Sequence, residues 1–158
     1  MRKLKASALL VGLALWTGLA AQGRPRHKAT VSEPPVVHDG DSPAYHAEPP
    51  RTKLGPILSA GQFSDPRIKA VYAMAAKVPK VLYQEPCYCY CDKGFGHHSL
   101  HDCFAGTHGS ECGICLEEGA YTYQQTKLGK TPGQIRAGIE RGEYRSIDLN
   151  ALGKDQKY

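Results

Sequence analysis

All six cysteines of the 158-residue chain lie in one short segment, and four of its seven histidines lie there too. Thiolate and imidazole groups are the usual protein ligands of soft and borderline metal ions. The cysteines are Cys87, Cys89, Cys91, Cys103, Cys112 and Cys115, and the histidines are His97, His98, His101 and His108. Because ligand types are concentrated in this way, the segment predicts a soft-metal site.

Disulfide bonds are the first alternative, since an even number of cysteines in an exported chain commonly forms bridges. Two cysteines one residue apart would close a very small and strained ring. Each sulfur of the Cys87–Cys91 run would therefore need a partner at Cys103, Cys112 or Cys115. Such pairing is possible, but it leaves the clustered histidines without a role.

A metal site uses both kinds of side chain. A bend can turn alternate cysteines toward one ion, and Cys112 and Cys115 at a helix start lie where the helix dipole favours thiolate. Zinc takes four ligands in a tetrahedron, fewer than the six sulfurs present. Cu(I) is softer, accepts two or three thiolates and shares sulfurs between ions, so copper is favoured and zinc is the alternative.

Enzymatic activity has little support in the sequence. Cys112-Gly113-Ile114-Cys115 has the spacing of thiol–disulfide oxidoreductases, but no βαβ pattern surrounds it. Glu117 and Glu118 follow in the same expected helix, where we interpret them as part of a solvated face. We therefore expect a binding protein, and oxidoreductase activity is the less favoured alternative.

Helical signals position these residues. Ser64-Asp65-Pro66 predicts a helix start, Leu100 and Phe104 predict a short helix over 98–105, and a third helix is expected from about Glu111 or Cys112 to Lys127. Thr131-Pro132-Gly133-Gln134 fits a capping box that opens a fourth helix. No stretch shows convincing strand alternation, so we expect a small all-α, Cys/His-rich domain of about four helices over 59–150.

The N-terminal region has a different composition. Residues 1–21 carry Arg2, Lys3 and Lys5, then an apolar run and small residues, the layout of a secretory signal peptide. Residues 22–58 hold seven of the 11 prolines and few apolar side chains, which predicts a disordered linker with solvated His27, His38 and His46. Residues 151–158 are expected to form a flexible tail.

The charge pattern excludes one class of partner. Three of the 20 Lys and Arg residues lie in the predicted signal, which leaves 17 against 15 Asp and Glu. Basic and acidic residues are also interspersed from Arg51 onward, so binding to nucleic acid is not expected. After signal cleavage, no remaining segment is apolar enough to predict a stable membrane span.

The cysteine segment resembles a bacterial family of exported proteins named for its PCYCGC motif. The motif reads Pro86-Cys87-Tyr88-Cys89-Tyr90-Cys91, with Tyr90 in the place of the usual glycine. The stretches 96–104, 108–116 and 135–139 resemble further elements of the family, so the resemblance covers roughly 65–144. It implies an exported domain with suspected metal-ligand cysteines, and it favours His97 and His108 over His98 and His101.

These inferences combine into one expectation. The chain is expected to be exported to the periplasm or outside the cell and to sequester or deliver Cu(I). The expected partners are metal ions and an extracytoplasmic metal-handling protein. A disulfide-stapled interaction module and a zinc-binding structural domain are the alternatives. The expected ligands are Cys87, Cys89, Cys91, Cys103, Cys112, Cys115, His97 and His108.

Overall fold

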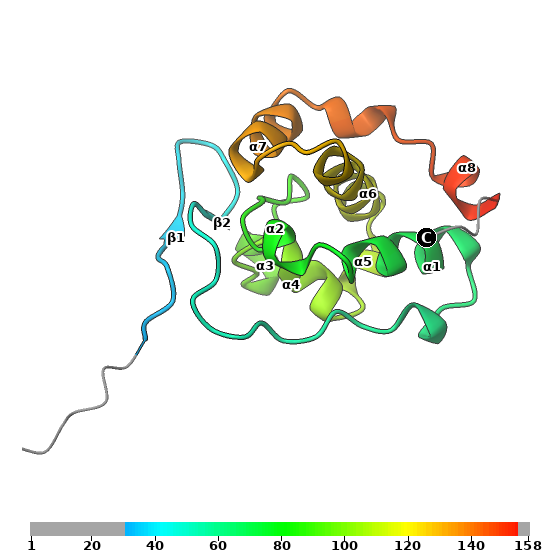
Figure 1. The fold of residues 1–158 in the computed structure, drawn as a ribbon, viewed down its shortest axis with the longest axis horizontal. Coiled ribbons are helices and arrows are strands. Elements are labelled where there is room, and N and C mark those ends of the chain that lie inside the picture. Colours follow the sequence, from blue (N-terminus) through cyan, green and yellow to red (C-terminus); the bar gives the residue numbers. More distant parts are fainter. Residues whose placement is uncertain (1–30, 155–158) are drawn as a thin grey trace, which may run out of the picture. The chain divides into compact units, whose positions relative to one another are not determined.

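The computed structural model describes residues 31–154, which are mostly helical (Figure 1). The predicted signal peptide over 1–21 lies outside the described residues, as do 22–30 and 155–158. The predicted all-α class is confirmed, and the described part adds only one small two-stranded sheet.

Four helices match the four that the sequence predicts. They are α1 (Pro66–Ala75), α4 (Leu100–Ala105), α6 (Gly113–Lys127) and α7 (Pro132–Glu140). Four shorter helices were not predicted: α2 (Pro79–Leu82), α3 (Cys91–Phe95), α5 (His108–Glu111) and α8 (Leu149–Lys154). Two 3-10 turns complete the helical elements, η1 (Ala60–Gln62) and η2 (Glu143–Ser146). The short helices have four to six residues, too few to show a periodic apolar pattern.

The predicted helix starts are correct because local side chains bind the free backbone N–H groups there. The Asp65 carboxylate accepts the Arg67 N–H at 2.8 Å, and Pro66 occupies the first position of α1. At α7 the Thr131 hydroxyl accepts the Gln134 N–H, and the Gln134 side chain accepts the Thr131 N–H.

Helix α6 is the central element of the fold. The main hydrophobic cluster joins it to α1, α2 and α4, with Val71, Tyr72, Leu82 and Phe104 fully buried. On its other side a second cluster joins α6 to α7 and η2 (Figure 1). The buried residues of this second cluster are Tyr121, Ile135, Ile139 and Tyr144. Helix α6, whose first turn carries part of the cysteine segment, is thereby packed on two sides.

The Pro-rich region packs against the helices, which differs from the predicted disordered linker over 22–58. Its described part contains β1 (Val36–Val37) paired antiparallel with β2 (Tyr45–His46). We call residues 34–46 the N-terminal strap. His46, predicted to be solvated, is only 6% exposed and stacks on Tyr83 with 3.9 Å between ring centroids. These long-range aromatic contacts supply the burial that the strap lacks in its own sequence.

The C-terminal end also differs from its prediction. Residues 151–154 belong to α8, which packs against α1, whereas a flexible tail was expected from 151. Leu149 and Leu152 contact the main hydrophobic cluster, and Gly153 lies against Arg67. These two leucines therefore contribute to docking the C-terminal segment on the core.

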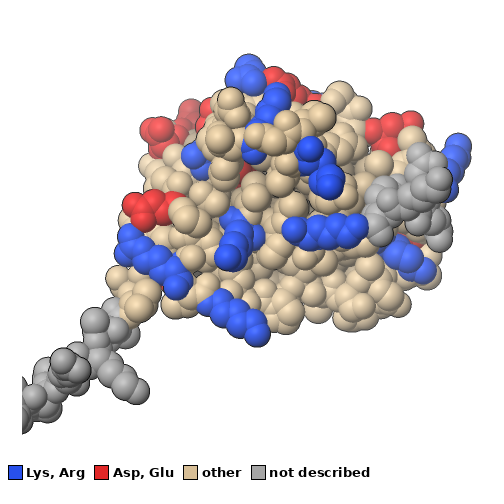
Figure 2. Space-filling view, in the orientation of Figure 1, with Lys and Arg blue, Asp and Glu red and all other residues tan. Residues whose placement is uncertain are grey.

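None of the helices within residues 31–154 is long and apolar enough to cross a bilayer. On the face shown in Figure 2, Lys and Arg side chains are spaced apart by neutral surface. Such spacing gives no continuous basic groove on this face.

The contact between α4 and α6 depends on a glycine. A Cβ atom at Gly119 would overlap the Phe104 ring, which is fully buried. We predict that Gly119→Ala lowers the free energy of unfolding by about 1–3 kcal/mol, the usual effect of overpacking a core. Chemical denaturation measures this change. Gly133→Ala in α7 is the control, because its nearest heavy atom lies 3.9 Å away; equal losses in both variants would contradict the prediction.

Candidate metal centre

A tight turn gathers the first three cysteines. The Tyr90 N–H donates to the Cys87 carbonyl at 3.0 Å, and Tyr90 has a left-handed backbone with φ of 57°. This turn spans Cys87 to Tyr90, and the sulfurs of Cys87, Cys89 and Cys91 lie within 4.8 Å of one another. The bend expected of the Cys-x-Cys-x-Cys run is therefore a turn with a left-handed residue.

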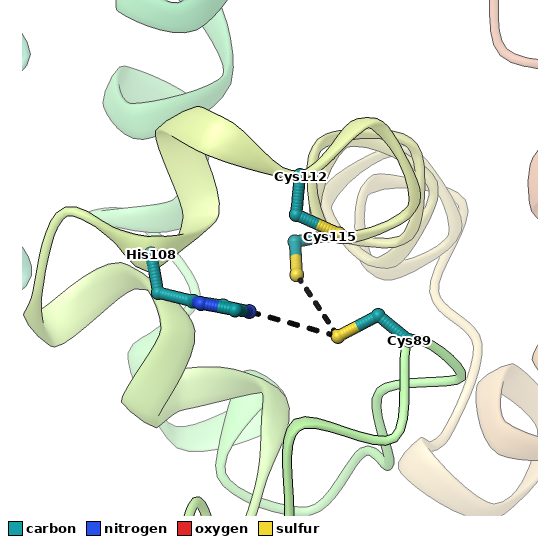
Figure 3. A group of neighbouring side chains, drawn as sticks. All are labelled: Cys89, His108, Cys112 and Cys115. Carbon is teal, nitrogen blue, oxygen red and sulfur yellow. Dashed lines mark hydrogen bonds between the residues drawn. The ribbon is translucent and has the colours of Figure 1, made fainter. Parts of the chain in front are cut away.

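The second pair of cysteines lies at the start of α6, as the sequence predicts. Cys112 is the N-cap residue, and Cys115 lies in the first turn. Figure 3 shows Cys89 and His108 approaching this helix start from two other segments. The Cys89 sulfur is 3.6 Å from the Cys115 sulfur and 3.7 Å from His108 Nε2. All four ligand atoms lie within 4.8 Å of one another.

Helix α4 and the residues before it complete the cluster. The Cys103 sulfur lies 3.4 Å from the Cys91 sulfur and 3.3 Å from His97 Nδ1. His108 also reaches this side, so Cys91, His97, Cys103 and His108 form a second group within 4.8 Å. The two imidazoles lie edge to face, with 5.0 Å between their centroids.

A buried trio links the two groups. The sulfurs of Cys87, Cys103 and Cys115 lie within 4.8 Å of one another, and Cys87 is 3.3 Å from both Cys89 and Cys115. The structure thus brings together all eight predicted ligand residues, and none of the six cysteines is in a disulfide. Two other histidines stay outside these groups. His98 is exposed, and His101 Nε2 faces the Gly55 carbonyl at 3.2 Å.

The sulfurs differ in protonation because they share hydrogen bonds. The Cys103, Cys115 and Cys87 thiols hydrogen-bond to Cys89 and hold its pKa below the usual range. The pKa of Cys103 is raised, first by its hydrogen bonds to Cys115 and Cys87 and then by burial. These hydrogen bonds favour the thiolate form of Cys89, a half-buried sulfur.

Glu118 is a site residue that the sequence interpretation missed. It was assigned to a solvated face, but it is fully buried, and its Oε1 accepts the Tyr88 N–H at 3.0 Å. Its carboxylate thus holds the cysteine turn onto α6. Position 118 is three residues after Cys115, on the same side of the helix, and this spacing was the available signal.

Burial also changes the acid strength of two carboxyl groups. It raises the pKa of Glu118 to about 8 and that of Glu85 to about 9. Both Glu85 oxygens lack a hydrogen-bond partner, and so does Glu118 Oε2. Uncharged carboxyl groups are favoured at these positions, since an isolated buried charge is strongly destabilising.

A family model described as proteins of unknown function with a PCYCGC motif matches residues 56–146. The chain belongs to this family. The match includes the whole cysteine segment and every helix from α1 to α7. Comparisons with curated proteins and with solved structures give no match.

The left-handed residue of the cysteine turn provides one prediction. Glycine, which stands at this place in the PCYCGC motif, adopts positive φ without steric cost, whereas a β-branched side chain is strongly disfavoured there. We predict that Tyr90→Gly folds normally and that Tyr90→Val is less stable than Tyr90→Gly by about 1–2 kcal/mol. Urea denaturation of the reduced proteins measures the difference, and equal stabilities would show that position 90 is not strained.

The buried carboxyl of Glu118 provides a second prediction. Below its ordinary pKa of 4.5 the folded and unfolded states are both protonated. Between 4.5 and about 8 only the unfolded state ionises, so the stability of the metal-free protein falls as pH rises. Glu118→Gln should weaken this fall while keeping an oxygen for the Tyr88 N–H. Denaturation of reduced protein at several pH values tests it; an unchanged slope in Glu118→Gln would contradict the assignment.

Proposed function

We propose that this protein binds Cu(I) outside the cytoplasm through a multi-thiolate cluster, and that it sequesters the metal or delivers it to another metal-handling protein. The observation that carries the proposal is the overlap of the ligand groups. Five of the six sulfurs belong to two groups each, with Cys112 the exception. A sulfur shared in this way is suited to bridging two ions, which soft thiolate sites for Cu(I) permit.

Zinc is the second candidate, and one group favours it. Cys89, His108, Cys112 and Cys115 offer three sulfurs and one nitrogen within 4.8 Å, the donor set of many structural zinc sites. This set would use only half of the cysteines. Cys87, Cys91 and Cys103 would then remain as buried thiols without a ligand role.

Two further functions receive less support. A disulfide-stapled module could pair Cys87 with Cys115 and Cys91 with Cys103, whose sulfurs lie 3.3 Å and 3.4 Å apart. The third bridge would then join Cys89 and Cys112, whose sulfurs lie within 4.8 Å of each other. This module would leave the approach of His97 and His108 to the sulfurs unexplained. A thiol–disulfide oxidoreductase needs an acidic attacking thiol, but burial raises the pKa of Cys112.

Export is part of the proposal and depends on residues 1–21. Their positive start and apolar run have the layout of a signal peptide. In an oxidising compartment, disulfide formation competes with metal binding for the free thiols. Burial of four of the six cysteines would protect them from that reaction.

Metal titration tests the proposal directly. Reduced protein, purified without oxygen, should hold more than one equivalent of Cu(I) against a coloured Cu(I) chelator. Cys103→Ser and Cys115→Ser should lower this stoichiometry, because each removes a sulfur shared by two groups. His98→Ala is the control, since His98 is exposed and belongs to no group.

The same samples separate the alternatives. Uptake of Zn²⁺ to one equivalent with no Cu(I) cluster would favour the zinc site. An intact mass six protons below that of the reduced chain, with no metal uptake after reduction, would contradict both metal proposals and support the disulfide module.

A further inference from the structure

The ligand residues differ sharply in their access to solvent. Cys103 and Cys115 are fully buried, and Cys87 and Cys91 are 2% and 4% exposed. Cys89, Cys112, His97 and His108 are half-buried. Cys89, Cys112 and His108 belong to one group and lie at one edge of the cluster. We infer that metal ions enter and leave through this edge, with Cys112 as the first and last sulfur to hold them, while the buried thiols retain the cargo. This inference rests on the proposed function.

The N-terminal strap closes the side of the cluster formed by Cys87 and Cys91, next to His97. Pro43 and Ala44 lie with these residues around a gap that has no room for a water molecule. The Ala44 N–H donates to Asp92 Oδ2 at 3.2 Å, which attaches the strap to α3 next to Cys91. An ion could not reach these sulfurs from this side unless the strap moved.

The edge formed by Cys89, Cys112 and His108 has a different construction. Three separate segments bring these side chains together (Figure 3). Its neighbours include Phe95, which is 69% exposed and lies over the His108 ring with 4.4 Å between centroids. Because the Phe95 ring is exposed and contributes little to the core, its side chain can rotate away from His108. It therefore covers this edge without blocking access to it.

The shared ligands provide a route from the edge to the interior. The outer group of Cys89, His108, Cys112 and Cys115 shares Cys115 with the buried trio. It shares Cys89 with the cysteine turn. Cys112 belongs to the outer group alone, which places it at the end of the route.

An ion can therefore move inward by replacing one ligand at a time. At each step an incoming thiol loses its proton and forms a bond to Cu(I), and an outgoing thiolate leaves and takes up a proton. Copper stays in the +1 state and no sulfur is oxidised, so the movement needs no redox partner.

Release kinetics test the inference. The full chain, reduced and loaded with Cu(I), is mixed with excess coloured chelator in a stopped-flow instrument. Cys112→Ser should retain the copper held by the buried thiols and release it about tenfold more slowly, a common size of effect for altering one residue at a metal site. Cys103→Ser should lose bound copper and release the remainder faster than the wild-type protein.

A variant at the surface keeps the inference testable if the buried substitution Cys103→Ser prevents folding. Phe95→Ala changes an exposed side chain and should speed release by uncovering His108, whereas His98→Ala should release copper at the wild-type rate. Faster release from Cys112→Ser, or equal rates in Phe95→Ala and wild type, would overturn the inference. These outcomes differ from failure of the proposed function, in which the wild-type protein takes up no Cu(I).

Discussion

Burial of sulfur in the main hydrophobic core is the constraint on which the rest of this structure depends. Cys87, Cys91, Cys103 and Cys115 belong to the same cluster as the apolar side chains that join α1, α2, α4 and α6. The candidate metal centre and the core are therefore one region. A free cysteine packs well as a small apolar side chain, so the fold tolerates these thiols without a metal. Converting several of them to thiolates without a cation would place uncompensated charge in the core.

The same region also buries carboxyl groups, which is unusual for a core of this size. Glu118 offsets part of its desolvation through the Tyr88 N–H, and both Glu118 and Glu85 are held toward their neutral forms. A carboxyl on α6 that binds the cysteine turn couples the geometry of Cys87 and Cys89 to the packing of that helix. The position of the sulfurs is thus set by polar contacts as well as by apolar packing.

Local signals made much of this structure predictable. Asp65 with Pro66, and Thr131 with Gln134, act through hydrogen bonds to residues two or three positions away, so sequence alone located those helix starts. The gathering of the six cysteines was expected from their concentration in one segment, whereas the choice of His97 and His108 among the histidines came from the family resemblance. The N-terminal strap and buried Glu118 were not predictable in this way, because His46 packs on Tyr83 and Glu118 binds Tyr88. These contacts join distant parts of the chain and leave no periodic pattern.

The overlap of the ligand groups would affect the order in which metal ions fill such a cluster. Each sulfur other than that of Cys112 serves two groups, so the deprotonation and ordering needed for one ion also prepare ligands for the next. Later ions would then bind more readily than the first. Partly filled protein would be scarce at intermediate metal supply, and the population would divide into empty and full molecules. A protein with this behaviour responds to a threshold of metal rather than in proportion to it.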